Sequence, residues 1–86
     1  MRVIVLTREN TDYARIVDTF ITDFKRQTGK DIEVIDADDP AAVSLAETYD
    51  IMDYPTILAL ASDGQLQNSW SGNALPTISE VSYYAA

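Results

Sequence analysis

Hydrophobic and polar residues follow two different periods along this chain, and the two periods predict seven elements. Short runs rich in β-branched residues predict strands, because these residues favour extended backbone. Apolar residues spaced three and four positions apart predict amphipathic helices. The predicted strands cover residues 3–6, 32–36, 55–60 and 65–70. Helices are predicted between the first and second strands, between the second and third, and after the fourth.

Capping residues mark the boundaries of the predicted helices. Thr11 is predicted to be the N-cap of the first helix, with Asp12 in the first turn, where a negative charge suits the helix dipole. Gly29 is predicted to end that helix. Asp39-Pro40 predicts the start of the second helix, and Thr77–Glu80 has the spacing of a capping box before the third. The apolar face of the first helix comprises Tyr13, Ile16, Val17, Phe20, Ile21 and Phe24.

The connections between these elements predict an α/β fold. The first two strands are joined through a helix, so they should be parallel. Asp63-Gly64 is typical of a hairpin turn, so the fourth strand should return antiparallel to the third. The order β-α-β-α-β-β-α then predicts a four-stranded mixed sheet with helices on both faces. At this length we expect residues 1–86 to form one domain.

Composition and charge narrow the possible functions. The chain has no Cys and no His, so it has neither a thiol nucleophile nor the commonest general base. All six basic residues lie within the first thirty positions, whereas positions 31–86 carry ten acids and no base. Such a charge distribution argues against nucleic-acid and membrane partners and favours a basic protein or peptide. We expect a cytoplasmic protein that is a monomer or a weak homodimer.

An acidic cluster at the end of the second strand has residue types that could bind a metal. Asp36, Asp38 and Asp39 offer oxygen ligands for a hard cation, but the segment lacks the glycine and the distal glutamate of an EF-hand loop. We interpret the cluster as the exit from the strand and the cap of the second helix. No metal site and no cofactor are predicted.

Three segments carry a resemblance to a known superfamily. Leu6–Ala14 resembles the glutaredoxin segment Tyr-Ser-Lys-Pro-Thr-Cys-Pro-Tyr-Cys, with a basic residue three positions before the first cysteine position. Tyr49–Thr56 is similar to the thioredoxin stretch Tyr-Gly-Ile-x-x-x-Pro-Thr, whose proline is cis. Trp70–Gly72, followed by Pro76, resembles the Trp-Ser-Gly-Phe-x-Pro element of glutaredoxin-like redoxins. In this order, the segments resemble a thioredoxin-superfamily domain of the glutaredoxin or thioredoxin type.

The resemblance also implies which residues surround the functional groove. Thr11 and Ala14 stand at the two cysteine positions; a register slip of one residue would place Asn10 and Tyr13 there instead. The groove implied by the resemblance comprises Arg8, Asn10, Tyr13, Asp53, Tyr54, Pro55, Gly72 and Asn73. The residue before the cis proline, here Tyr54, offers its backbone to an extended peptide in that superfamily.

The missing cysteines exclude thiol–disulfide exchange by this chain. A threonine hydroxyl cannot replace a thiolate in that reaction, and alanine has no reactive atom. We therefore expect no enzymatic activity, but a redox-inactive domain that serves as a binding or scaffold module for an extended polypeptide. The alternative is a small-molecule binder that retains glutathione, which Arg8 and Tyr13 would help to hold. Arg8 is expected to be offset by an anion or by a carboxylate such as Glu9 or Asp53.

Overall fold

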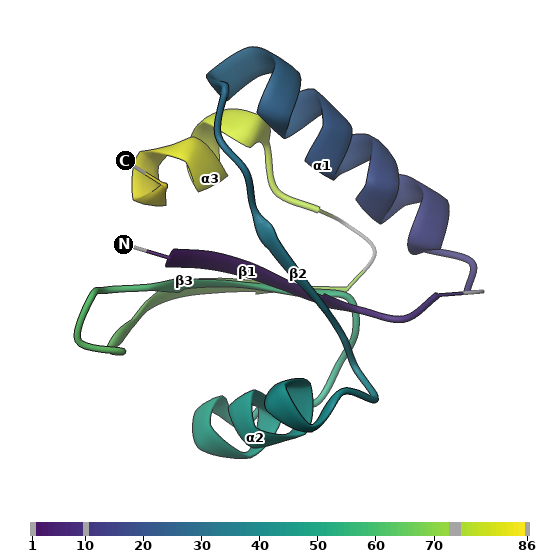
Figure 1. Ribbon diagram of the computed structural model, residues 1–86, viewed down its shortest axis with the longest axis vertical. Helices are drawn as coiled ribbons and strands as arrows, with labels where there is room; N and C mark the ends of the chain where they lie inside the picture. Colours follow the sequence, from purple (N-terminus) through teal and green to yellow (C-terminus); the bar gives the residue numbers. More distant parts are fainter. Residues whose placement is uncertain (1, 10, 73–74, 86) are drawn as a thin grey trace.

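The computed structural model describes residues 2–9, 11–72 and 75–85 and contains the seven predicted elements in the predicted order (Figure 1). They are β1 (Arg2–Thr7), α1 (Ala14–Thr28), β2 (Glu33–Asp36), α2 (Pro40–Tyr49), β3 (Thr56–Leu60), β4 (Leu66–Ser71) and α3 (Ile78–Tyr84).

The sheet has the strand order β2-β1-β3-β4. β1 is parallel to β2 and antiparallel to β3, and β4 is antiparallel to β3. The predicted mixed four-stranded sheet is therefore confirmed. β1 and β3 lie in the middle of the sheet, which is why Val3–Leu6 and Ile57–Leu60 are continuous apolar runs; both runs are buried.

Helices cover both faces of the sheet, as predicted (Figure 1). The sheet therefore separates the core into two clusters, one on each face. On the face covered by α1 and α3, Val3 and Val5 of β1 pack with Phe24 and Val81. On the α2 face, the alternate β1 residues Ile4 and Leu6 pack with Ala42, Leu58 and Leu60. Successive side chains of a strand point to opposite faces, so one apolar run supplies both clusters.

The start of α1 differs from the prediction. The helix begins at Ala14, and Tyr13 is the N-cap residue without a side-chain cap. The Thr11 hydroxyl donates instead to the carbonyl oxygen of Arg8 (2.8 Å), and the Ala14 N–H donates to the Thr11 carbonyl (3.2 Å). The prediction of a Thr11 cap with Asp12 in the first turn was wrong, because the hydroxyl is used by a local turn that precedes the helix.

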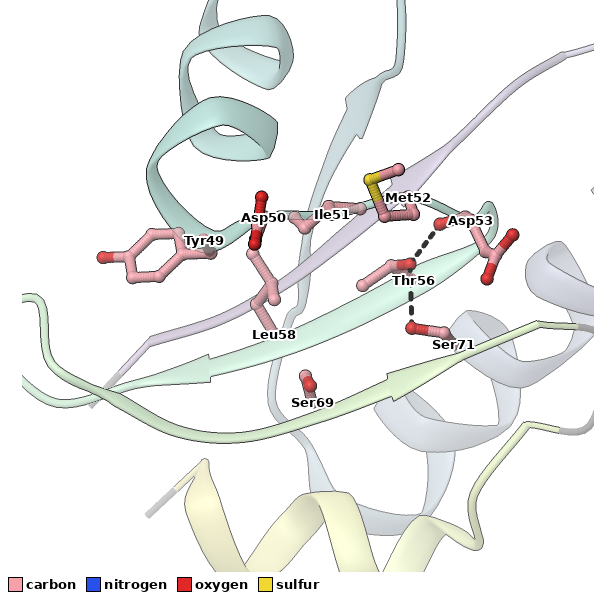
Figure 2. A pocket seen from close by; sticks show the side chains of 9 residues that line it. All are labelled: Tyr49, Asp50, Ile51, Met52, Asp53, Thr56, Leu58, Ser69 and Ser71. Carbon is pink, nitrogen blue, oxygen red and sulfur yellow. Dashed lines mark hydrogen bonds between the residues drawn. The ribbon is translucent and has the colours of Figure 1, made fainter.

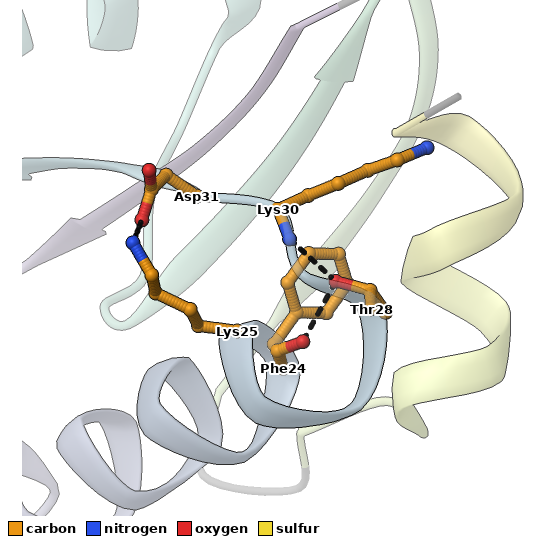
Figure 3. A network of polar contacts seen from close by, with 5 residues as sticks. All are labelled: Phe24, Lys25, Thr28, Lys30 and Asp31. Atoms are coloured by element: carbon orange, nitrogen blue, oxygen red, sulfur yellow. Dashed lines mark hydrogen bonds and ion pairs between the residues drawn. The ribbon is translucent and has the colours of Figure 1, made fainter.

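The other helix boundaries were predicted correctly. Gly29 ends α1 with φ 71°, and its N–H donates to the Lys25 carbonyl (2.8 Å). Figure 3 shows how this end is held: the Thr28 hydroxyl donates to the Phe24 carbonyl (2.7 Å), and Lys25 Nζ bonds Asp31 Oδ1 (2.6 Å). The other two predicted caps are also present, Asp39 at the start of α2 and the reciprocal capping box of Thr77 with Glu80 at α3.

An ion pair joins the ends of β1 and β2. Arg2 Nε and Nη2 donate to Glu33 Oε1 and Oε2 at 3.0 and 2.9 Å. The hydrogen bonds from Arg2, together with its charge, outweigh desolvation and lower the pKa of the Glu33 carboxyl. Both side chains are about half exposed, at 55% and 50%, so the pair is expected to stabilise the fold only modestly.

This pair makes the stability depend on pH. Replacing Glu33 by glutamine is expected to lower the free energy of unfolding at neutral pH by less than about 1 kcal/mol. Because the folded-state pKa of Glu33 is lowered, its contribution is present above the unfolded-state pKa and is lost as pH falls through the folded-state pKa. Urea unfolding of both proteins at several pH values tests this. Glu47→Gln, at an exposed position of α2, is the control; a Glu33→Gln deficit that persists in acid would contradict the assignment.

Candidate functional site

The two degenerate redox-motif positions lie where β1 leads into α1, and neither carries a reactive group. Thr11 is partly buried and its hydroxyl is bonded to the Arg8 carbonyl, while Ala14 is the first residue of α1. Ala14 lines a hollow of about 280 Å³ together with Thr7, Arg8 and Glu9. With no cysteine anywhere in the chain, this hollow holds no sulfur nucleophile.

Arg8 and Tyr54 are brought together, as the resemblance implies. The guanidinium carbon of Arg8 lies 5.2 Å from the centre of the Tyr54 ring, within the range of a cation–π contact. Arg8 Nη1 also pairs with Asp38 Oδ1 at 3.5 Å. A carboxylate therefore offsets Arg8, as expected, but it is that of Asp38 and not of Glu9 or Asp53, because the fold brings Asp38, at the turn after β2, next to Arg8.

Tyr13 and Tyr54 contribute to opposite faces of the sheet. Tyr13 packs against the cluster beneath α1 and α3, whereas Tyr54 packs against the α2-face cluster. The two rings therefore do not fill one common groove. The candidate residues Asn10 and Asn73 lie outside the described residues.

Pro55 and Gly72 meet at the start of β3. The Tyr54–Pro55 peptide bond is cis, and Pro55 is buried. The Gly72 N–H donates to the Pro55 carbonyl oxygen (2.9 Å). Gly72 has φ 91°, a conformation that strongly favours glycine over other residues. The two motifs that sequence analysis singled out at Pro55 and Gly72 are thus adjacent in space.

The segment from Asp50 to Asp53 borders a hollow of about 230 Å³ on the α2 face of the sheet (Figure 2). Met52 lies at this hollow with 83% of its surface exposed. Nine residues line it: Tyr49, Asp50, Ile51, Met52, Asp53, Thr56, Leu58, Ser69 and Ser71. Among these, sequence analysis singled out only Asp53 as a site residue.

Thr56 holds this segment against the sheet. Thr56 is 1% exposed, and its hydroxyl donates to the Asp53 carbonyl oxygen at 2.5 Å. Ser71 Oγ on β4 lies 3.4 Å from the same hydroxyl (Figure 2). The position of Asp53 in the hollow therefore depends on a buried hydroxyl at the first residue of β3. A signal for Ser69 and Ser71 was present in the sequence, because alternate residues of a strand share one face.

The acidic cluster after β2 has a structural explanation. Asp36 Oδ1 accepts from the Asp38 N–H (2.9 Å), and Asp39 Oδ1 accepts from the Ala41 N–H (2.9 Å) at the start of α2. Within residues 2–9, 11–72 and 75–85, no three His, Cys, Asp or Glu residues are grouped so that they could hold a metal ion.

None of the described helices is both long and apolar enough to cross a membrane.

A mixed sheet of this order, with α1 and α3 on one face and α2 on the other, defines a thioredoxin-like fold. Comparison with solved structures supports this assignment. The chain is similar to thioredoxin 1 from Thermosipho africanus (TM-score 0.66, 19% identity), covering 99% of this chain and 90% of that one. It is also similar to thioredoxin O2 from Arabidopsis thaliana (TM-score 0.67, 12% identity; 95% and 69% covered). A thioredoxin from Thermus thermophilus aligns with a TM-score of 0.61 at 15% identity (96% and 69% covered).

At these identities the structural likeness establishes the fold alone. No protein-family model matches the sequence, and no curated protein matches it. The thioredoxin-like fold combined with the absence of cysteine fits a redox-inactive module.

Proposed function

We propose that this chain is a binding module that docks an extended, basic polypeptide at the Tyr54-Pro55 edge. The observation that carries the proposal is the hollow beside this edge. Its rim combines a methionine side chain that is 83% exposed with the carboxylates of Asp50 and Asp53. Flexible, polarisable methionines suit surfaces that accept varied side chains, and the carboxylates favour cationic residues of the ligand.

The backbone at Tyr54 supports the same mode of binding. Among the described residues, neither the N–H nor the C=O of Tyr54 takes part in a hydrogen bond. An extended peptide binds such groups as an added strand would, and gains affinity from main-chain hydrogen bonds. Tyr54 itself is held in place between Arg8 and the α2-face cluster, so these backbone groups belong to an ordered segment.

The charges around the hollow favour a cationic ligand. No Lys or Arg lines the hollow, because all six basic residues of the chain precede Asp31. Among the described residues, Arg8 is the cation that contacts this edge, through the ring of Tyr54. Arg8 is itself paired with Asp38. A basic polypeptide therefore complements this face better than an acidic one. The cytoplasmic location inferred from the sequence stays a prediction.

The proposal is tested by NMR titration of the full chain with an extended lysine-containing peptide. Shifts are expected at Asp50–Thr56 and Gly72. The double variant Asp50→Asn/Asp53→Asn is expected to weaken binding roughly three- to tenfold at low salt, because it removes two rim charges. Asparagine suits the left-handed conformation of Asp50 (φ 59°), so the backbone is retained.

The matched control removes two carboxylates that do not line the hollow, through Asp18→Asn/Glu47→Gln. Equal weakening by the control would show that only net charge matters and would overturn the proposed site. Peptide-induced shifts confined to other surfaces would do the same. Reduced glutathione is titrated separately: shifts at Arg8 and Tyr13 with glutathione, but none with peptide, would favour the small-molecule alternative.

A further inference from the structure

A second hollow, of about 300 Å³, lies between β4 and α3, on the opposite side of the sheet from Asp53. Its lining combines three aromatic rings, one amide and one carboxylate, from Asn68, Trp70, Glu80, Tyr83 and Tyr84. Neither the sequence analysis nor the proposed polypeptide edge accounts for this combination.

The three rings meet edge to face. The centres of Trp70 and Tyr84 are 5.6 Å apart with an interplanar angle of 67°, and those of Tyr83 and Tyr84 are 5.0 Å apart at 83°. Rings at such angles expose their faces in different directions, as the walls of a cage do, whereas a parallel stack would hide them. Trp70 and Tyr84 are anchored on the core beneath α1 and α3, and Asn68 Nδ2 lies 3.3 Å from the Tyr84 hydroxyl oxygen.

The third ring, that of Tyr83, lies in solvent: Tyr83 is 77% exposed, whereas its neighbour Tyr84 packs on the core. An aromatic ring left in water next to two anchored rings costs hydrophobic free energy unless a ligand covers it.

The charge of the hollow favours a cation. Glu80 Oε1 accepts from the N–H and the hydroxyl of Thr77, and no hydrogen bond to Oε2 is made among the described residues. The faces of aromatic rings carry a negative quadrupole and attract ammonium groups. No cation of the chain lines the hollow, and Lys30, which reaches α3, is bonded to the Ala85 carbonyl oxygen (3.2 Å).

We propose that this hollow binds the alkylammonium group of a lysine side chain, presented by an extended polypeptide alongside β4. β4 is an edge strand of the sheet, and residues 66–71 include no charged residue and no proline that would block a further strand. Asn68 and Trp70 lie on the α3 side of β4, so alternate side chains of an added strand would point toward the hollow.

The tryptophan itself reports on this site. Trp70 is the only tryptophan of the chain, so its fluorescence is titrated with the peptide acetyl-Thr-Val-Lys-Val-Thr-amide. Saturable change is expected, and the same peptide with norleucine in place of lysine is expected to bind at least about fivefold more weakly, because it lacks the cation. An equal response to both peptides would overturn the proposal.

Two variants test the residues named. Tyr83→Leu keeps an apolar side chain at an exposed position but removes the ring, and is expected to weaken lysine-peptide binding about three- to fivefold. Glu80→Gln removes the charge but retains a residue that suits the capping box, and is expected to weaken binding about twofold or more. Unchanged affinity in both variants, with α-helical circular dichroism intact, would overturn the proposal.

The control separates this site from the Tyr54-Pro55 edge. Asp53→Asn, on the opposite face, is expected to leave the Trp70 response to the lysine peptide within about twofold of wild type. Loss of the Trp70 response in Asp53→Asn, with Tyr83→Leu unaffected, would assign the lysine to the first hollow and contradict the inference.

Discussion

Replacing Phe24 by alanine is expected to lower the free energy of unfolding by about 3–5 kcal/mol. Phe24 is fully buried in the middle of the cluster beneath α1 and α3, where its ring lies 6.3 Å from that of Phe20. The substitution removes buried apolar area and leaves a cavity that the surrounding strands cannot fully close. For a chain of 86 residues, whose total stability is roughly 4–13 kcal/mol, this loss is at least about a quarter of the total.

Ile16→Ala is the matched control for Phe24→Ala, because Ile16 lies on the same helix with 48% of its surface exposed. It is expected to change stability by less than about 1 kcal/mol, since little apolar surface is lost and alanine has the higher helix propensity. Urea unfolding followed by far-ultraviolet circular dichroism measures both. Similar losses in the two variants would show that α1 does not dock on the sheet through Phe24.

The arrangement of the elements was predictable from the sequence because the burial of one or both faces of an element determines the spacing of its apolar residues. Val3–Leu6 has no polar position, which is the pattern of a strand covered on both faces, and β1 is indeed central. The polar alternation of β4 likewise fits an edge strand, with Trp70 on the covered side. Gly64 adopts φ 89° in the predicted hairpin turn, where its N–H donates to the Ala61 carbonyl (2.9 Å).

Contacts between distant segments were not predictable in the same way. Thr11 has the residue type of an N-cap, yet its hydroxyl donates to the Arg8 carbonyl oxygen, and α1 begins only at Ala14. The ion-pair partner of Arg8 is thirty residues away in sequence, at Asp38, and only the β1–β2 pairing brings them together. Local pattern carries no information on such a contact.

Some of the contacts that the resemblance implies at the candidate site are present in the structure. The resemblance pointed correctly to the adjacency of Pro55 and Gly72, and to the proximity of Arg8 and Tyr54. Met52 was missed because an isolated methionine in a loop has no sequence signal until its exposure is known. Tyr13 was grouped with Tyr54 because the resemblance places both around one groove, but they pack against opposite faces of the sheet.

The start of α1 carries no cysteine, although the fold is thioredoxin-like. The two positions that the resemblance aligns with cysteines are Thr11 and Ala14. Thr11 carries a hydroxyl that is bonded to a backbone carbonyl, and Ala14 carries only a methyl group. The proposed function assigns recognition to the backbone of Tyr54 and the carboxylate of Asp53. The buried hydroxyl of Thr56 bonds the carbonyl of Asp53, so Thr56 is an informative residue to change.

Replacing Thr56 by valine is expected to lower the free energy of unfolding by about 1–3 kcal/mol and to loosen the segment that leads to Pro55. Valine has nearly the same shape as threonine, so packing is retained, but the Asp53 carbonyl loses the hydroxyl that donates to it at 2.5 Å. Urea unfolding measures the stability. Amide hydrogen exchange measures the segment: the N–H groups of Asp50 and Ile51, which donate to the Ala46 carbonyl, are expected to exchange faster than in the wild-type protein.

Two companion variants isolate the hydrogen bond from the packing around it. Thr56→Ser keeps the hydroxyl and loses one buried methyl group, so it is expected to cost about 1 kcal/mol while exchange at Asp50 and Ile51 stays as slow as in the wild-type protein. Ser71→Ala removes only the longer 3.4 Å contact at an exposed position and is expected to change stability by less than about 0.5 kcal/mol. If Thr56→Val exchanged as slowly as Thr56→Ser, the hydroxyl would not be what holds Asp53 in place. The position of the acidic rim would then have to come from the packing of Ile51 and Tyr54 on the α2-face cluster.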